Sequence, residues 1–300
     1  MATSCDIPHM VKIVTRFAPS PTGRLHVGHG WSALMAMDMA RAAGGAMRLR
    51  IEDIDGARSR PEHVAGIIED LRWLGVEWDG EVVFQSQRLE LYETALDRLR
   101  GKGLVYPCFC TRAEIAAEIA ASGSAPHGAD GTIYPGICRS LGENERAERI
   151  ARGDAHCWRL DMGRAVAQAG PLHWPDMDAG EVEARPEQAG DVVMARKEAP
   201  TSYHLAATLD DAEMGISYVL RGDDLSAATD VHRLLQALLD LPTPVYRHHP
   251  LLVDASGKRL AKRTGGITLA ELRADGVDPA RLRDDLRARR FPVGICLASA

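Results

Sequence analysis

The sequence predicts an α/β fold built on a parallel sheet with helices on its outside. Strand-like and helix-like runs alternate over residues 11–107, and this alternation returns near Tyr203. Between them, residues 108–195 contain short elements, loops and few long periodic runs. Because strand–helix–strand order places successive strands in parallel, we expect two halves of one Rossmann-like sheet with an insertion between them.

The first half is expected to contain two strands and three helices. Residues 11–17 form a strand with consecutive β-branched side chains, and a helix follows that ends at a Gly pair. Apolar residues alternate with arginines over 47–51, which predicts the second strand. A second helix has Pro61 in its first turn and ends at Gly75, and a third covers about residues 88–100.

The second half is expected to contain a strand at 216–220 and then a helix with four apolar residues at helical spacing. From Tyr246 the pattern is typical of loops and a hairpin, and a basic loop and a short tail follow. The predicted division is 11–107 for the first half-sheet, 108–195 for the insertion, 196–245 for the second half-sheet, and 246–300 for the basic loop and tail.

Composition and charge limit the class of protein. No apolar run approaches the roughly 20 residues of a membrane span, and no basic flank precedes an apolar segment at the N-terminus. We therefore expect a cytoplasmic protein that does not contact a membrane, in which disulfides are not expected. A net charge of −6 does not exclude nucleic acid, because a local basic patch suffices. The candidate patch, for which a solvated helix face is an equal explanation, is Arg281, Arg283, Arg287, Arg289 and Arg290.

The turn over residues 16–29, RFAPSPTGRLHVGH, joins the first strand to the first helix. Backbone amides and the helix dipole favour a phosphate at such a helix start, where histidines can donate to its oxygens. The stretch resembles the first signature motif of class I aminoacyl-tRNA synthetases, and RFAPSPTG resembles their glutamyl and glutaminyl branch. The resemblance implies catalytic roles for His26 and His29. It also implies that ATP, with Mg²⁺, binds Pro19, Gly23, His26, Gly28 and His29.

The basic loop over residues 258–263 lies where this class carries its second signature, KMSKS. The chain has RLAKR over 259–263 and so departs from that motif at the first Lys and at the Ser. A mobile lysine can follow the ATP phosphates and offset charge during phosphoryl transfer. We therefore expect Lys262 to bind ATP and to act in catalysis, while Ala261 leaves open how the loop closes.

The resemblance also implies a glutamate pocket. Glutamate carries two carboxylates and one ammonium, so Glu52 would oppose the ammonium and Arg221 would hold the side-chain carboxylate in bidentate fashion. Arg16 would bind the other carboxylate, although the assignment of the two carboxylates to Arg16 and Arg221 stays open. The implied glutamate-binding set is Arg16, Phe17, Ala18, Pro19, Ser20, Glu52, Tyr203 and Arg221.

Three cysteines in the insertion suggest a metal site. Cys108 and Cys110 are one residue apart, Cys138 follows after a loop, and a capping box at Thr111 places the pair at a helix entrance. From spacing alone, buried thiols and zinc are equally good explanations. The stretch resembles the zinc-bearing insertion of a truncated glutamyl-tRNA synthetase paralogue, which implies Zn²⁺ on Cys108, Cys110, Tyr134 and Cys138. His127 and His156 are competing donors.

Only 37 residues follow Arg263, which is too few for the helical anticodon-binding domain of bacterial glutamyl-tRNA synthetases. The whole pattern resembles the glutamyl-queuosine tRNA(Asp) synthetases, which lack that domain. That resemblance implies a monomeric ligase. It would activate L-glutamate with ATP, without tRNA, and transfer the glutamyl group to queuosine at the wobble position of tRNA(Asp). Two alternatives stay open: a minimal glutamyl-tRNA synthetase that charges a tRNA 3′ end, and a non-catalytic RNA- or amino-acid-binding paralogue.

Overall fold

A computed structural model describes residues 13–56, 58–121, 127–128, 131–254, 257 and 267–298. The strands of the central sheet are β1 (Val14–Phe17), β2 (Ala46–Ile51), β3 (Val83–Phe84), β11 (Tyr218–Gly222) and β12 (Val245–His249). The helices beside it are α1 (Val27–Ala42), α2 (Pro61–Leu74), α3 (Leu89–Gly101), α7 (Tyr203–Glu213) and α8 (Ser226–Leu239).

The parallel sheet expected from the sequence is confirmed. β1, β2 and β3 pair in parallel in that order, and β11 pairs in parallel with β12. The amide of Ser217 donates to the carbonyl of Val14 at 3.0 Å, and the Val14 amide donates to the Ser217 hydroxyl at 2.9 Å, which places β11 beside β1. The first strands of the two halves are therefore neighbours, and their carboxyl ends meet at the middle of the sheet.

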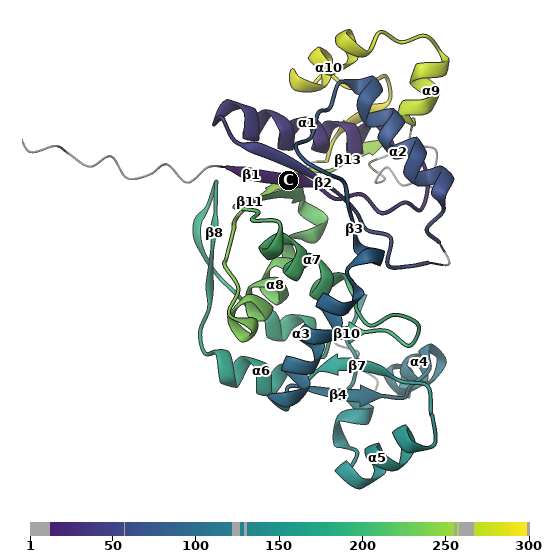
Figure 1. The fold of residues 1–300 in the computed structure, drawn as a ribbon, viewed down its shortest axis with the longest axis vertical. Helices are drawn as coiled ribbons and strands as arrows, with labels where there is room; N and C mark the ends of the chain where they lie inside the picture. Colours follow the sequence, from purple (N-terminus) through teal and green to yellow (C-terminus); the bar gives the residue numbers. More distant parts are fainter. Residues whose placement is uncertain are drawn as a thin grey trace, which may run out of the picture.

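Helices cover both faces of this sheet, with α1 and α2 on one side and α7 and α8 on the other (Figure 1). The expected apolar faces are buried: Ile67 and Leu71 of α2 and Val231 and Leu234 of α8 are all 0% exposed. The turn from α1 to β2 has no room for a side chain, because a Cβ on Gly45 would lie 1.9 Å from a backbone oxygen. Within the described residues, no helix is both long and apolar enough to cross a membrane.

The insertion forms a small antiparallel sheet, ordered β10-β7-β4, together with short helices. Its elements are β4 (Val105–Cys108), α4 (Arg112–Ala121), β5 (His127–Gly128), β6 (Gly131–Thr132), α5 (Glu143–Ala151), β7 (Cys157–Leu160), α6 (Met162–Ala169), β8 (His173–Asp176), β9 (Gly180–Glu183) and β10 (Val193–Ala195). The hairpin of β8 and β9 departs from this small sheet and pairs with β12. The insertion therefore also extends the central sheet at its edge.

The expectation of loop and hairpin structure from Tyr246, followed by a short tail, is wrong for most of the described residues. β12 is a fully paired parallel strand, and the tail contains β13 (Leu252–Asp254), α9 (Leu269–Ala274), α10 (Pro279–Arg287) and β14 (Ile295–Leu297). Leu269, Leu282 and Leu286 bury their side chains in the core of the first half-sheet. Arg287 forms an ion pair with Asp38 of α1 at 2.7 Å, so this arginine of the suggested basic patch has a structural partner.

Candidate active site

A pocket opens at the carboxyl ends of β1, β2, β11 and β12, beside the start of α1. It brings together many of the residues that the sequence predicted: Arg16, Phe17, Ala18, His26, Gly28, His29, Glu52, Tyr203 and Arg221. These side chains come from both halves of the sheet. The pocket therefore depends on the close approach of β1 and β11.

Four predicted residues lie elsewhere or outside the described part of the chain. Pro19, Ser20 and Gly23 belong to the turn between β1 and α1 and are not among the residues that line the pocket. The Pro19 carbonyl accepts a hydrogen bond from the Glu52 amide at 3.1 Å, so this turn fixes the end of β2. Lys262 and the rest of the 258–263 loop fall outside the described residues.

The two histidines of the first motif form the cap of α1. The Gly28 amide donates to Nδ1 of His26 at 3.1 Å, and the His26 amide donates to Nδ1 of His29 at 3.2 Å. Their ring centroids are 3.7 Å apart. Because both rings use Nδ1 in the cap, they are fixed at the pocket wall, next to the positive end of the 16-residue helix α1. This arrangement suits a bound phosphate.

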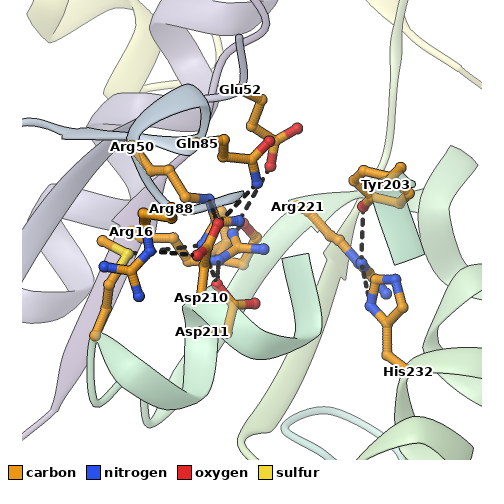
Figure 2. Close-up of polar contacts among 12 residues, drawn as sticks. Arg16, Arg50, Glu52, Gln85, Arg88, Tyr203, Asp210, Asp211, Arg221 and His232 are labelled. Carbon is orange, nitrogen blue, oxygen red and sulfur yellow. Dashed lines mark hydrogen bonds and ion pairs between the residues drawn. The ribbon is translucent and has the colours of Figure 1, made fainter. Parts of the chain in front are cut away.

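Arg221, at the carboxyl end of β11, is buried among neutral acceptors (Figure 2). Its guanidinium donates to the Tyr203 hydroxyl at 3.2 Å, to Thr229 Oγ1 at 2.6 Å, and to ring nitrogens of His232 and His248 at 3.3 Å each. Within the described residues no carboxylate forms an ion pair with it. A buried guanidinium without a counter-ion is costly, so this pocket wall favours an anionic ligand.

The histidines around Arg221 are uncharged. Burial, followed by the charge of Arg221, lowers the pKa of His248 to about 4 and places the pKa of His232 well below its ordinary value. The same two causes lower the pKa of His204 to about 4. Neutral imidazoles can accept from the guanidinium, which imidazolium rings cannot. The rings therefore orient Arg221 without neutralising it.

The opposite side of the site contains a buried ion-pair network (Figure 2). Asp211 of α7 accepts from Arg50 at 2.6 Å and from Arg16 at 3.1 Å, and Arg50 donates to Glu52 at 3.1 Å. Burial raises the pKa of the Glu52 carboxyl, and the charge of Arg50 opposes that shift. Neither Arg50 nor Asp211 was predicted from the sequence to take part in the site. Alternation over 47–51 indicated a strand with arginines on one face, but not which arginine was enclosed.

Several other residues of the pocket wall were also missed. Trp31 and Ser32 lie in the first turns of α1, where helical spacing gave no reason to distinguish them. His249 ends β12, and its Nε2 lies 3.0 Å from the Ser32 hydroxyl. That residue could have been found only if 245–249 had been recognised as a strand.

The predicted cysteines converge in the insertion. The sulfur atoms of Cys108, Cys110 and Cys138 lie within 4.8 Å of one another, and the Tyr134 hydroxyl is 3.4 Å from Cys108 Sγ and 3.5 Å from Cys110 Sγ. The predicted capping box closes the entrance of α4, with Thr111 and Glu114 exchanging hydrogen bonds at 2.6 and 3.2 Å. Cys157, which was not predicted to take part, faces Cys108 across β4 and β7.

Comparison with known proteins decides the family. Residues 12–294 match the family model described as tRNA synthetases class I (E and Q), catalytic domain. A curated Glutamyl-Q tRNA(Asp) synthetase from Rhodobacter capsulatus is 50% identical over 276 residues, which cover 90% of this chain and 98% of that protein. The chain belongs to the class I (E and Q) tRNA synthetase family. A second member, from Symbiobacterium thermophilum, is 44% identical over 88% of this chain and 82% of its own length.

Solved structures of larger relatives support the same fold. A glutamate-tRNA synthetase from Elizabethkingia anophelis superposes with a TM-score of 0.78 at 27% identity, covering 93% of this chain. A glutamate tRNA ligase from Elizabethkingia meningosepticum, solved in complex with its amino acid, gives the same values. The chain spans 61% of the length of each of these two structures. As a member of its family, the protein is a ligase of the aminoacyl-tRNA synthetase type.

The neutral state of His232 makes stability depend on pH. The unfolded chain takes up a proton on this residue near pH 6.5, whereas the folded protein does not, so stability is lost as pH falls from about 6.5 toward the much lower folded pKa. His232→Gln removes this contribution. When the unfolding free energy is measured by urea titration at pH 6.5 and at pH 5.5, it should fall less for this variant than for the wild type, by about 1 kcal/mol.

Exposed His173 offers a matched control, because His173→Gln should leave the pH dependence of the wild type in place. If the unfolding free energy fell equally for the wild type and for His232→Gln between pH 6.5 and 5.5, the interpretation of His232 as a neutral buried imidazole would be wrong.

Proposed function

We propose that the protein activates L-glutamate with ATP, without requiring tRNA, and transfers the glutamyl group to queuosine at the wobble position of tRNA(Asp). The observation that carries the first step is the buried guanidinium of Arg221. It has no carboxylate partner among the described residues, and it lines the same pocket as the start of α1. One wall of the pocket thus suits a carboxylate and the other a phosphate.

The charges of L-glutamate match this site. Arg221 pairs with the side-chain carboxylate, and Glu52 opposes the ammonium. Nη2 of Arg16 has no hydrogen bond to the described residues, while Nε and Nη1 are held by Asp211 and the Leu220 carbonyl, so Nη2 is available to the α-carboxylate. Glutamine would bring an amide to Arg221 and leave its charge uncompensated, which disfavours it.

ATP is proposed to lie along the start of α1, on the other side of the pocket. His26 and His29, together with Gly28 and the helix dipole, stabilise charge on the phosphates, and Pro19 and Gly23 shape the turn that bounds them. Lys262, which lies outside the described residues, is proposed to follow the phosphates with its loop. Mg²⁺ bound with ATP would neutralise phosphate charge.

The reaction then proceeds in two displacements. An oxygen of the α-carboxylate of glutamate attacks the α-phosphorus, pyrophosphate leaves, and a glutamyl-adenylate forms. A hydroxyl of the queuosine cyclopentenediol attacks the activated carbonyl carbon, AMP leaves with the electron pair of the broken C–O bond, and the hydroxyl proton passes to the departing phosphate or to solvent. Orientation and charge stabilisation supply the rate, with no protein nucleophile needed. The Rhodobacter and Symbiobacterium relatives are named Glutamyl-Q tRNA(Asp) synthetases, which supports queuosine-containing tRNA(Asp) as acceptor.

Arg221→Ala tests the carboxylate site. In glutamate-dependent ATP–pyrophosphate exchange, KM for glutamate should rise about 100-fold, because a charge-assisted bidentate pair is lost, while KM for ATP changes little. Arg247→Ala is a matched control, since that exposed arginine on neighbouring β12 pairs with Asp178. An unchanged KM for glutamate would remove Arg221 from the pocket.

The acceptor is tested by transfer of labelled glutamate to tRNA(Asp) with and without queuosine, followed by nuclease mapping of the labelled nucleotide. Label at the wobble position, and only in queuosine-containing tRNA, is the expected result. Label on the terminal adenosine, independent of queuosine, would instead establish a minimal glutamyl-tRNA synthetase. If neither adenylate formation nor transfer is detected, the remaining explanation is a non-catalytic binding paralogue.

A zinc ion on Cys108, Cys110, Cys138 and Tyr134 is proposed for the insertion. Tetrahedral zinc with Zn–S bonds of ~2.3 Å places its sulfur ligands about 3.8 Å apart, which agrees with sulfur atoms that lie within 4.8 Å of one another. The Tyr134 hydroxyl contacts two of these sulfurs, which supports it as the fourth ligand. The site lies in the insertion, away from the pocket, so we assign it a structural role.

Zinc content is measured after dialysis against metal-free buffer. The wild type should retain about one zinc per chain, because closed sulfur-rich sites bind tightly. Cys138→Ser should lose it. Cys296→Ser is the matched control, because this exposed cysteine lies on β14. Metal-free wild-type protein that is still folded would refute the zinc assignment.

A further inference from the structure

Helix α7 carries two adjacent buried carboxylates, Asp210 and Asp211, which do not line the pocket. Asp210 is 0% exposed and Asp211 is 6% exposed. The helix begins at Tyr203, which does line the pocket, and the acidic pair lies two turns further on. Buried carboxylates that do not line the pocket need partners within the protein. Asp210 and Asp211 have different partners.

Asp211 contacts the residues that form the amino-acid subsite. Its Oδ1 accepts from Nε of Arg16 at 3.1 Å and from Nη1 of Arg50 at 2.6 Å. Arg50, 0% exposed, extends its Nη2 to Glu52 Oε1 at 3.1 Å. Oδ1 of Asp211 thus contacts Arg16 directly and reaches Glu52 through Arg50. It links the two opposite charges of the subsite (Figure 2).

Asp210 contacts residues outside the pocket. It accepts from Gln85 Nε2 at 2.8 Å, from Arg88 Nε at 2.8 Å and from the Tyr92 hydroxyl at 2.9 Å. Among the described residues, its one approach to the subsite network is an ion pair with Nε of Arg50 at 3.7 Å. The chain therefore offers a control of the same type, on the same helix and with similar burial.

We propose that Asp211 is a positioning residue for amino-acid activation, which holds Arg16 toward the α-carboxylate and, through Arg50, holds Glu52 toward the ammonium. This inference rests on the proposed function. Arg16 and Arg50 both contact Asp211, and Arg50 also contacts Glu52 and lies 3.7 Å from Asp210. Without the charge of Asp211, Arg16 would lose the contact that fixes its Nε, and Arg50 would bind Glu52 more strongly and draw it from the ammonium.

The same network predicts a pH effect that a purely structural residue would not have. Glu52 is faced by Arg50 from its own strand, by Arg16 from β1, and by Asp211 and Tyr203 from α7. Burial raises the pKa of Glu52, the two arginines lower it, and the charge of Asp211 adds to the rise. Removing that charge lowers the pKa of Glu52, so the acidic limb of kcat/KM for glutamate should move to lower pH.

The test compares Asp211→Asn with Asp210→Asn in glutamate-dependent ATP–pyrophosphate exchange. Asp211→Asn should raise KM for glutamate about tenfold or more at pH 7.5, leave KM for ATP within about twofold, and shift the acidic limb downward. Asp210→Asn should lower the urea midpoint of unfolding but leave KM for glutamate and the acidic limb near the wild-type values.

Asp211→Glu keeps the inference testable if the Asn variant does not fold. It retains the charge but displaces it by one methylene, so KM for glutamate should rise while the acidic limb stays in place. Unchanged KM for glutamate in the folded Asp211 variants, or equal effects of the Asp210 and Asp211 variants, would overturn the inference. Absence of glutamate-dependent exchange in the wild type would instead refute the proposed function.

Discussion

The burial of arginine at the carboxyl ends of the central strands is the constraint on which the site depends. Arg16, Arg50 and Arg221 are between 0% and 6% exposed, and a guanidinium keeps its charge under these conditions. Each must be stabilised by acceptors in the protein or by a ligand. Arg16 and Arg50 have carboxylate partners from α7 and, for Arg50, from Glu52 after β2, whereas within the described residues Arg221 has only hydroxyl and imidazole acceptors. The difference in partners distinguishes the two arginines that are paired with carboxylates from Arg221, whose charge no carboxylate of the described residues offsets.

Helix α7 contacts both groups of buried arginines. The helix begins with Tyr203, beside Arg221, and two turns later presents Asp211 to Arg16 and Arg50. Its apolar face packs with β10, the last strand of the insertion, through Met194 and Leu205, both 0% exposed. Placement of the ligand pocket therefore depends on how the insertion returns the chain to the sheet.

The sequence was sufficient for the parts of the site that are contained in contiguous motifs. The turn over 16–29 predicted the junction of β1 and α1, because strand, loop and helix signals occur in one stretch. Through the family resemblance it also supplied six residues that line the pocket, whereas Pro19, Ser20 and Gly23 do not line it. Tyr203 and Arg221 were placed only through the family resemblance. Arg50, Asp211 and Thr229 were not predicted, because polar residues with helical or strand spacing indicate a solvated face unless the tertiary partner is known. β12 was missed for the same reason: His248 and His249 contact the site and Arg247 pairs with Asp178, so none of the three gives an apolar signal.

The neutral acceptors around Arg221 are as informative as the absence of an acid. A carboxylate in place of Thr229 or His232 would stabilise the guanidinium more strongly, but it would also compete with an anionic ligand for the same hydrogen-bond donors. Imidazoles whose pKa values are lowered by burial and by Arg221 itself accept its hydrogen bonds and leave its charge in place. The positive charge thus stays available to the pocket above the folded pKa values of these rings. A ligand that carries one more carboxylate than ammonium balances it, which is the charge of glutamate and not of glutamine.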